Sequence, residues 1–265
     1  PAEIPMKKRT ILTTVVAFIL LVAVIAAGLN AVFTVAYVNA GFLTYTPKGE
    51  RAAQELKEEL NGYLGTSTTF LDLSEVRATA EAYPRFRVVS VEKRSPAAVE
   101  IKIEERRAAF AMQAENGWDI LDADGFRIDT VDSAQDHLVL AGDFSFSYRD
   151  GVIDGAYASQ LLELYGVLSE LLGEPRANVL SVTLEDRGNT SSDRFDNFRI
   201  AMREGVQILI GEPSVRAGDK ARAALETYFS LSESERVTGT IITAINGQTG
   251  EVTAGYDDFI AAESE

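Results

Sequence analysis

A long uncharged segment near the N-terminus constrains this chain more than any other feature. Residues 10–47 contain no Asp, Glu, Lys, Arg or His, although charged residues make up 25% of the 265-residue sequence. The apolar run within this segment, 11–29, would extend roughly 28 Å as a helix, close to the ~30 Å hydrocarbon core of a bilayer. The sequence therefore predicts a transmembrane helix over 10–32.

The charges beside this run predict its orientation. Lys7, Lys8 and Arg9 directly precede it, and no basic residue follows before Lys48. Because basic residues favour the cytoplasmic side of a membrane helix, we expect a cytoplasmic tail over 1–9 and extracytoplasmic domains after the helix. This is a single-pass, type II arrangement.

A cleaved signal peptide is the alternative interpretation of the apolar run. Ala26 and Gly28 would supply the small residues of a cleavage site. The apolar stretch of a signal peptide is normally about 7–15 residues long, however, and this one is longer. Its length favours a membrane anchor.

The net charge and the missing residue types exclude several classes of function. A formal charge of −15 repels phosphate backbones, so nucleic acid is not an expected partner. The absence of cysteine excludes disulfides, thiol nucleophiles and thiolate zinc sites. The only histidine is His137, and a lone histidine is more often structural than catalytic. We expect no catalytic residue, no cofactor and no metal site.

Residues 33–106 predict the order strand, helix, helix, strand, strand. Thr46-Pro47 provides an N-cap followed by proline in the first helical turn, and Asp72 with Glu75 has the spacing of a capping box. Period-3.6 and period-2 patterns then identify the buried faces. The residues expected on those faces are Ala53, Leu56, Leu60 and Tyr63 in the first helix, Leu73, Val76, Ala80 and Tyr83 in the second, Val89 and Val91 in the next strand, and Val99, Ile101 and Ile103 in the last.

Residues 107–257 predict a mixed, β-rich domain with two packed helices. Glu115-Asn116-Gly117 between two alternating segments is a hairpin signal, and Asp154 is the expected cap of a helix over 157–172. A second helix is expected over 215–228, and 258–265 is expected to be a disordered acidic tail. The fold class is therefore α+β behind a single transmembrane helix. Later strands are expected at 179–184, 198–202, 206–210, 239–245 and 251–256.

Several stretches in this order resemble the FtsQ/DivIB family of bacterial cell-division proteins. The strongest is 63–106, which holds the second helix, a Tyr-Pro, two strands around a proline turn and a closing Glu-Arg. The strand and glycine of 33–46, Leu121-Asp122 with Gly125, and the strand and lysine-bearing helix of 206–229 also match the family's pattern. The closing strand pair at 239–256 completes the resemblance.

The resemblance implies a POTRA-like domain over 33–106 and a β-domain over 107–257. It implies a non-enzymatic scaffold at the division septum, in the bacterial cytoplasmic (inner) membrane. The implied partners are the small bitopic proteins FtsB (DivIC) and FtsL, the septal peptidoglycan synthase complex through them, and the lipid bilayer. An exported cell-wall enzyme and a POTRA-type polypeptide transport module remain the alternative functions.

The last predicted strand is the expected partner-binding site. If it lies at a sheet edge, its backbone groups can pair with another chain, as the matching strand of the family does with FtsB and FtsL. The alternative is an ordinary edge strand protected by the charges of Glu251 and Asp257-Asp258. The strand at 87–93 offers a second possible edge. The expected partner-binding residues are Gly250, Glu251, Val252, Thr253, Ala254, Gly255 and Tyr256.

Two further motifs have simpler interpretations than a functional site. Asp122, Asp124 and Gly125 suggest a calcium loop, but the further oxygen ligands and terminal glutamate of an EF-hand are missing, which favours a hairpin turn. Trp118 could anchor an interface, but its place in an alternating strand favours half-buried packing on the core.

Overall fold

The computed structural model describes residues 6–134, 137–185 and 196–259 of the chain. The chain divides after Glu105 into two compact units. The tail expected over 258–265 falls mainly on 260–265, which lie outside the described residues.

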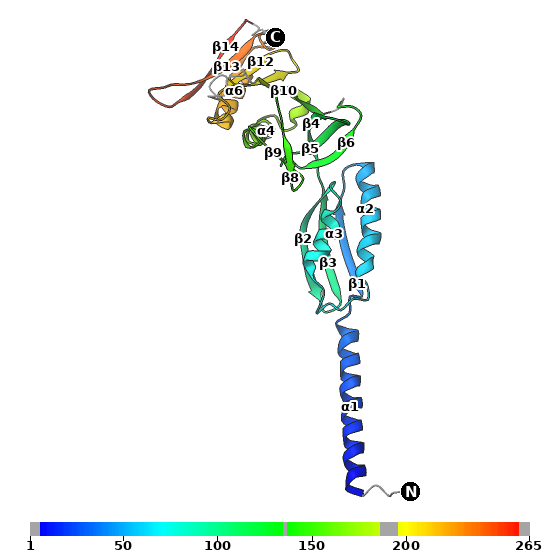
Figure 1. Ribbon diagram of the computed structural model, residues 1–265. Coiled ribbons are helices and arrows are strands. Elements are labelled where there is room, and N and C mark those ends of the chain that lie inside the picture. Colours follow the sequence, from blue (N-terminus) through cyan, green and yellow to red (C-terminus); the bar gives the residue numbers. More distant parts are fainter. Residues whose placement is uncertain (1–5, 135–136, 186–195, 260–265) are drawn as a thin grey trace. The chain divides into compact units, whose positions relative to one another are not determined.

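The first element that the structure describes is helix α1, Met6–Val32 (Figure 1). A membrane crossing requires about 20 predominantly apolar residues in one helix. In the described part of the chain, no helix is both long enough and apolar enough to meet this requirement. The transmembrane helix expected over 10–32 is therefore wrong, and so is the single-pass location in the bacterial inner membrane. Lys7, Lys8 and Arg9, the predicted membrane-orienting residues, lie near the start of α1.

The first unit contains a three-stranded sheet in the order β1-β3-β2, with two helices packed against it (Figure 1). β1 is parallel to β3, and β2 is antiparallel to β3. This is the expected α+β arrangement of strand, helix, helix, strand, strand. The elements are β1 Tyr37–Leu43, α2 Pro47–Leu60, the 3-10 turn η1 Asn61–Tyr63, α3 Leu73–Glu81, β2 Phe86–Ser95 and β3 Ala98–Glu105.

The core of this unit follows the predicted apolar patterns except in β2. Val99, Ile101 and Ile103 of β3 are at most 2% exposed, as expected. In β2, however, Val88 faces the core and Val89 is 56% exposed. A register shift between Val88 and Ser90 explains the error, because a β-bulge inserts one residue and reverses the faces that follow it.

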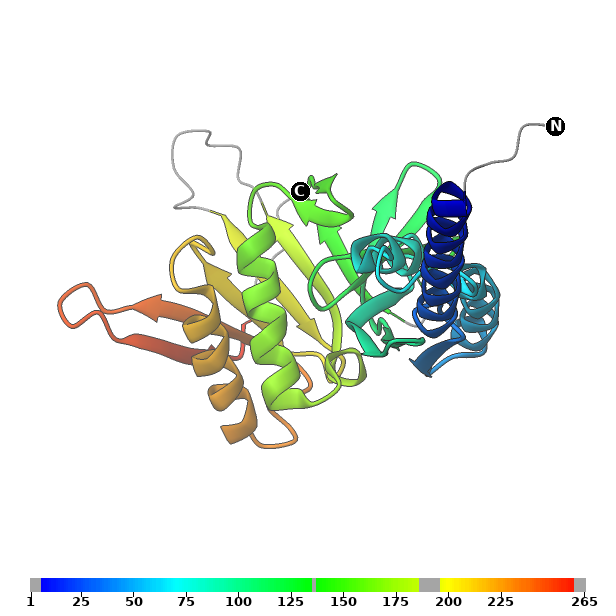
Figure 2. The ribbon, with the colours of Figure 1, turned by 90° about the horizontal axis from the view of Figure 1, so that it is seen from below.

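The second unit is built on a nine-stranded mixed sheet in the order β14-β13-β12-β11-β10-β7-β4-β5-β6. Figure 2 shows α4 and α6 side by side on one face of this sheet. A two-stranded ribbon, β8-β9, lies outside it. The elements are β4 Ala108–Ala114, β5 Gly117–Asp122, β6 Arg127–Val131, β7 Leu138–Gly142, β8 Ser147–Arg149, β9 Val152–Asp154, α4 Ala158–Leu172, α5 Pro175–Asn178, β10 Val179–Glu185, β11 Asn197–Met202, β12 Gln207–Gly211, α6 Ala217–Ser230, β13 Thr240–Ile245 and β14 Val252–Asp257.

Alternate residues of the central strands pack against the two helices. Phe198, Ile200 and Ile208 are fully buried beneath α4 and α6. The hairpin expected at Glu115-Asn116-Gly117 exists, but Ala114 pairs with Gly117, so the two-residue turn is Glu115-Asn116. The expected cap at Asp154 is wrong, because Asp154 ends β9 and the N-cap of α4 is Tyr157 in a left-handed conformation. 

Candidate functional site

Strand β14 lies at one edge of the nine-stranded sheet, with β13 as its neighbour within the sheet (Figures 1 and 2). Val252, Thr253, Ala254, Gly255 and Tyr256 all lie in this strand. Gly250 and Glu251 lie just before it, in the connection from β13. The structure thus brings the seven predicted residues together along one sheet edge.

The register of the hairpin determines which backbone groups of β14 face outward. The Asn246 N–H donates to the Glu251 carbonyl over 2.8 Å, so this pair is hydrogen-bonded. Because such pairs alternate in an antiparallel ladder, Thr253 and Gly255 also bond to β13. The N–H and C=O groups of Val252, Ala254 and Tyr256 therefore point away from the sheet. Sequence patterns alone could not predict which residues of β14 bond to β13 and which point outward.

The side chains of the same two sets of residues lie on opposite faces of the sheet. Ala254 and Tyr256 pack against the core beneath α6. Thr253 and Gly255 lie on the other face of the sheet and are exposed. A strand added to this edge would therefore form backbone hydrogen bonds with Val252, Ala254 and Tyr256. Its side chains would lie beside those of β14 on both faces of the sheet.

Three contacts hold the edge in place. The Tyr256 hydroxyl lies 3.2 Å from the carbonyl oxygens of both Glu235 and Thr238, which share its single proton. Arg216 Nη1 donates to the Gly250 carbonyl over 2.6 Å at the other end of the strand. A partner that pairs with an edge already held in position loses less free energy to ordering on binding.

A buried lysine and a buried tyrosine fix α6 beneath the edge, and sequence patterns alone do not predict their roles. Lys220 is 3% exposed, and its Nζ donates to the Gly211 and Glu212 carbonyls over 2.6 and 3.0 Å. Burial lowers the pKa of this amine. Burial and the hydrogen bond to Glu204 raise the pKa of Tyr228 to about 12. The apolar stripe predicted a helix here, but it did not distinguish an exposed lysine from a buried one.

The second possible edge for partner binding, β2, is better protected. It carries Arg87, Glu92, Lys93 and Arg94, and two register shifts interrupt its pairing with β3. Charged side chains and bulges are the usual means by which proteins discourage pairing at an edge. β14 has no charged residue before Asp257 and shows no register shift. It is therefore the more open of these two edges.

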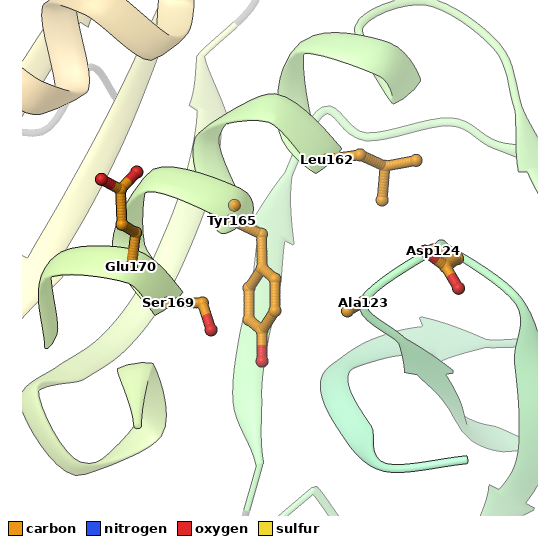
Figure 3. Close-up of a pocket in the computed structure, with 7 residues that line it drawn as sticks. Ala123, Asp124, Leu162, Tyr165, Ser169 and Glu170 are labelled. Atoms are coloured by element: carbon orange, nitrogen blue, oxygen red, sulfur yellow. The ribbon is translucent and has the colours of Figure 1, made fainter. Parts of the chain in front are cut away.

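A pocket of ≈ 620 Å³ lies between α4 and the β5–β6 turn (Figure 3). Figure 3 shows the Glu170 carboxylate turned away from Ala123 and Asp124, and Glu170 is held by Arg222 over 2.6 Å. The pocket walls do not bring a nucleophile and a base together. Its lining residues are Ala123, Asp124, Leu162, Tyr165, Gly166, Ser169 and Glu170.

The sequence motif beside this pocket forms a hairpin turn. Asp122 Oδ1 accepts hydrogen bonds from the backbone N–H groups of Asp124 and Phe126, and Oδ2 accepts from Arg106 over 2.6 Å. The carboxylate thus stabilises the turn itself. Over the residues that the structure describes, no group of three or more His, Cys, Asp or Glu side chains could hold a metal ion. Trp118 is half-buried against a small core cluster, as expected.

Comparison with known families identifies part of the first unit. The family model described as "POTRA domain, FtsQ-type" matches residues 51–106, which include most of α2 and all of α3, β2 and β3. No curated protein matched the chain. The match covers less than half of the sequence and supports the resemblance to FtsQ/DivIB proteins in that segment.

Proposed function

We propose that this chain is a non-enzymatic protein of the bacterial cell-division machinery that binds another polypeptide by strand addition at β14. The FtsQ-type POTRA match supports the cell-division role. The exposed, pre-positioned edge of β14 is the observation that carries the binding mode.

In this mechanism the backbone supplies affinity and the side chains supply specificity. An incoming strand exchanges hydrogen bonds with Val252, Ala254 and Tyr256. The Thr227 hydroxyl lies 3.5 Å from the Ala254 carbonyl, at the limit of a hydrogen bond. A partner N–H that bonds to this carbonyl therefore replaces only a weak contact. The partners would be FtsB/DivIC-like and FtsL-like proteins, which would link this chain to septal peptidoglycan synthesis.

Proline substitution at neighbouring positions tests the mechanism. Ala254→Pro removes an outward N–H, and proline is tolerated in edge strands where its nitrogen faces solvent. We expect an unchanged fold and about five- to tenfold weaker partner binding, since a backbone hydrogen bond contributes about 1–1.5 kcal/mol. Thr253→Pro removes an N–H that bonds to β13, so it should loosen the hairpin as well.

Thr253→Ala is the matched control, because it retains every backbone donor. Affinity for FtsB-like and FtsL-like partners is measured by co-purification and titration, and folding by circular dichroism. A folded Ala254→Pro protein that binds these partners as tightly as wild type would exclude β14 as the docking strand.

A further inference from the structure

A row of uncharged residues crosses β12, β13 and β14 on the face of the sheet opposite the helices, although the chain as a whole is strongly acidic. Ile208 and Ile241 point into the core beneath the helices, so their strand neighbours Leu209 and Ile242 face the opposite side. The register places Leu209, Ile242 and Gly255 in one row across β12, β13 and β14. No member of this row is charged.

Gly255 leaves open space at the outer end of the row. A Cβ built on it would meet no atom within 4 Å. Ile242, its cross-strand neighbour, is 49% exposed. A glycine at this position therefore leaves the side of Ile242 uncovered, and a large side chain from an adjacent strand could cross Gly255 to reach it.

Acidic residues lie at both ends of β14 on this face. Glu251, Thr253, Gly255 and Asp257 alternate with the residues that point toward α6, and all four are exposed. The face thus presents acid, threonine, glycine and acid in order along the strand. The complementary strand would carry basic residues at its two ends and an apolar residue opposite the glycine.

We propose that β14 selects a strand with a large apolar side chain beside Gly255 and basic residues beside Glu251 and Asp257. This inference rests on the proposed function and names the chemistry of the partner segment. In an antiparallel partner, the apolar residue follows one basic residue by two positions and precedes the other by four. Gly255 and the partner residue opposite it would form a non-hydrogen-bonded pair, the kind of pair in which the two residues lie closest together.

Synthetic peptides provide the probe. The reference peptide is a blocked Lys-Val-Leu-Val-Thr-Val-Lys, the second replaces Leu with Ala, and the third replaces both Lys with Glu. Each is titrated into the full chain and followed by backbone amide NMR shifts. We expect the Leu peptide to bind about tenfold more tightly than the Ala peptide, as for a side chain that gains one apolar contact. The Glu peptide should bind more weakly than the reference, and this difference should shrink in high salt.

Gly255→Val fills the space without removing a backbone group. In this variant the preference for Leu over Ala should fall below about threefold, while the Ala peptide binds as before. Gly247→Val is the matched control, because Gly247 lies in the adjoining loop with equally open surroundings. It should leave the preference unchanged.

The outcomes separate this inference from the function on which it rests. If both peptides bind wild type equally and Ala254→Pro weakens both interactions, strand addition stands and the apolar subsite is excluded. If Ala254→Pro leaves the binding of the Leu peptide unchanged, the edge itself is excluded. Failure of the Leu peptide to bind at millimolar concentration, or a preference that survives Gly255→Val, would also overturn the subsite.

Discussion

Replacing Gly49 with alanine should destabilise the first unit, although alanine is the better helix former. Gly49 lies in the first turn of α2, and its N–H donates to the Thr46 hydroxyl over 2.9 Å. Above it sits the carboxylate of Glu105, which is 2% exposed. A Cβ at position 49 would overlap both oxygens of that carboxylate. Either the helix start or the carboxylate must move.

The expected loss follows from the contacts of Glu105. The carboxylate accepts hydrogen bonds from the Tyr45 N–H over 2.5 Å, the Thr46 N–H over 2.9 Å and the Thr46 hydroxyl. Hydrogen bonds to a charged group contribute about 1.5–3 kcal/mol each, so losing two costs about 3–6 kcal/mol. Alanine returns at most about 1 kcal/mol of helix propensity. The net loss in the free energy of unfolding should be about 2–5 kcal/mol.

Urea unfolding with two probes measures this loss. Far-UV circular dichroism follows both units, whereas Trp118 fluorescence reports on the second unit alone, which should unfold as in wild type. Gly166→Ala is the control, since the surroundings of Gly166 in α4 are open, and it should be neutral or stabilising by up to about 1 kcal/mol. In a Glu105→Ala background, Gly49→Ala should no longer be destabilising. A stabilised Gly49→Ala single variant would refute the steric argument.

Two further predictions concern the second unit. The pKa of Tyr228 is raised to about 12 from 10.0, so its contribution to stability is complete below pH 10 and is lost as the pH rises through 12. Between pH 10 and pH 12, the free energy of unfolding should therefore fall less in Tyr228→Phe than in wild type, by at most about 3 kcal/mol. The same pH dependence in both proteins would contradict this prediction. Arg199→Met leaves the buried Glu185 without the guanidinium that contacts it over 2.5 Å, so it should cost about 3–5 kcal/mol by Trp118 fluorescence. Adding Glu185→Met should recover most of the loss, and no recovery would show that the pair is not the cause.

Local patterns predicted the elements of the first unit well. The buried stripe of Ala53, Leu56 and Leu60 was correct, and so was the cap at Asp72, whose Oδ1 accepts from the Ser74 N–H. Such signals lie within a few residues along the chain and depend on one helical turn. The prediction of a membrane-spanning helix also rested on a local pattern, and it was wrong.

Signals that depend on distant residues were not predictable. The bulge that exposes Val89 is a property of the pairing between β2 and β3, and no residue type in β2 predicts it. The sequence placed Glu105 in the closing Glu-Arg of 63–106, whereas its carboxylate holds Thr46, the N-cap of a helix that begins some 60 residues earlier. The alternation of β3 predicted the buried face but not a buried charge with a remote partner.

The candidate site combines both kinds of information. The sequence predicted a strand at 251–256 with few large apolar residues, but its place at the edge depends on the order of nine strands. The hydrogen-bond register of the hairpin then determines which residues of the strand can bond to a partner and which face solvent. Ala254 and its even-numbered neighbours offer their backbone to a partner, while Gly255 and its odd-numbered neighbours offer the exposed face. Because these sets do not overlap, a proline at 254 and a valine at 255 perturb affinity and selectivity separately. One strand can therefore bind through its backbone and discriminate through the residue that lacks a side chain.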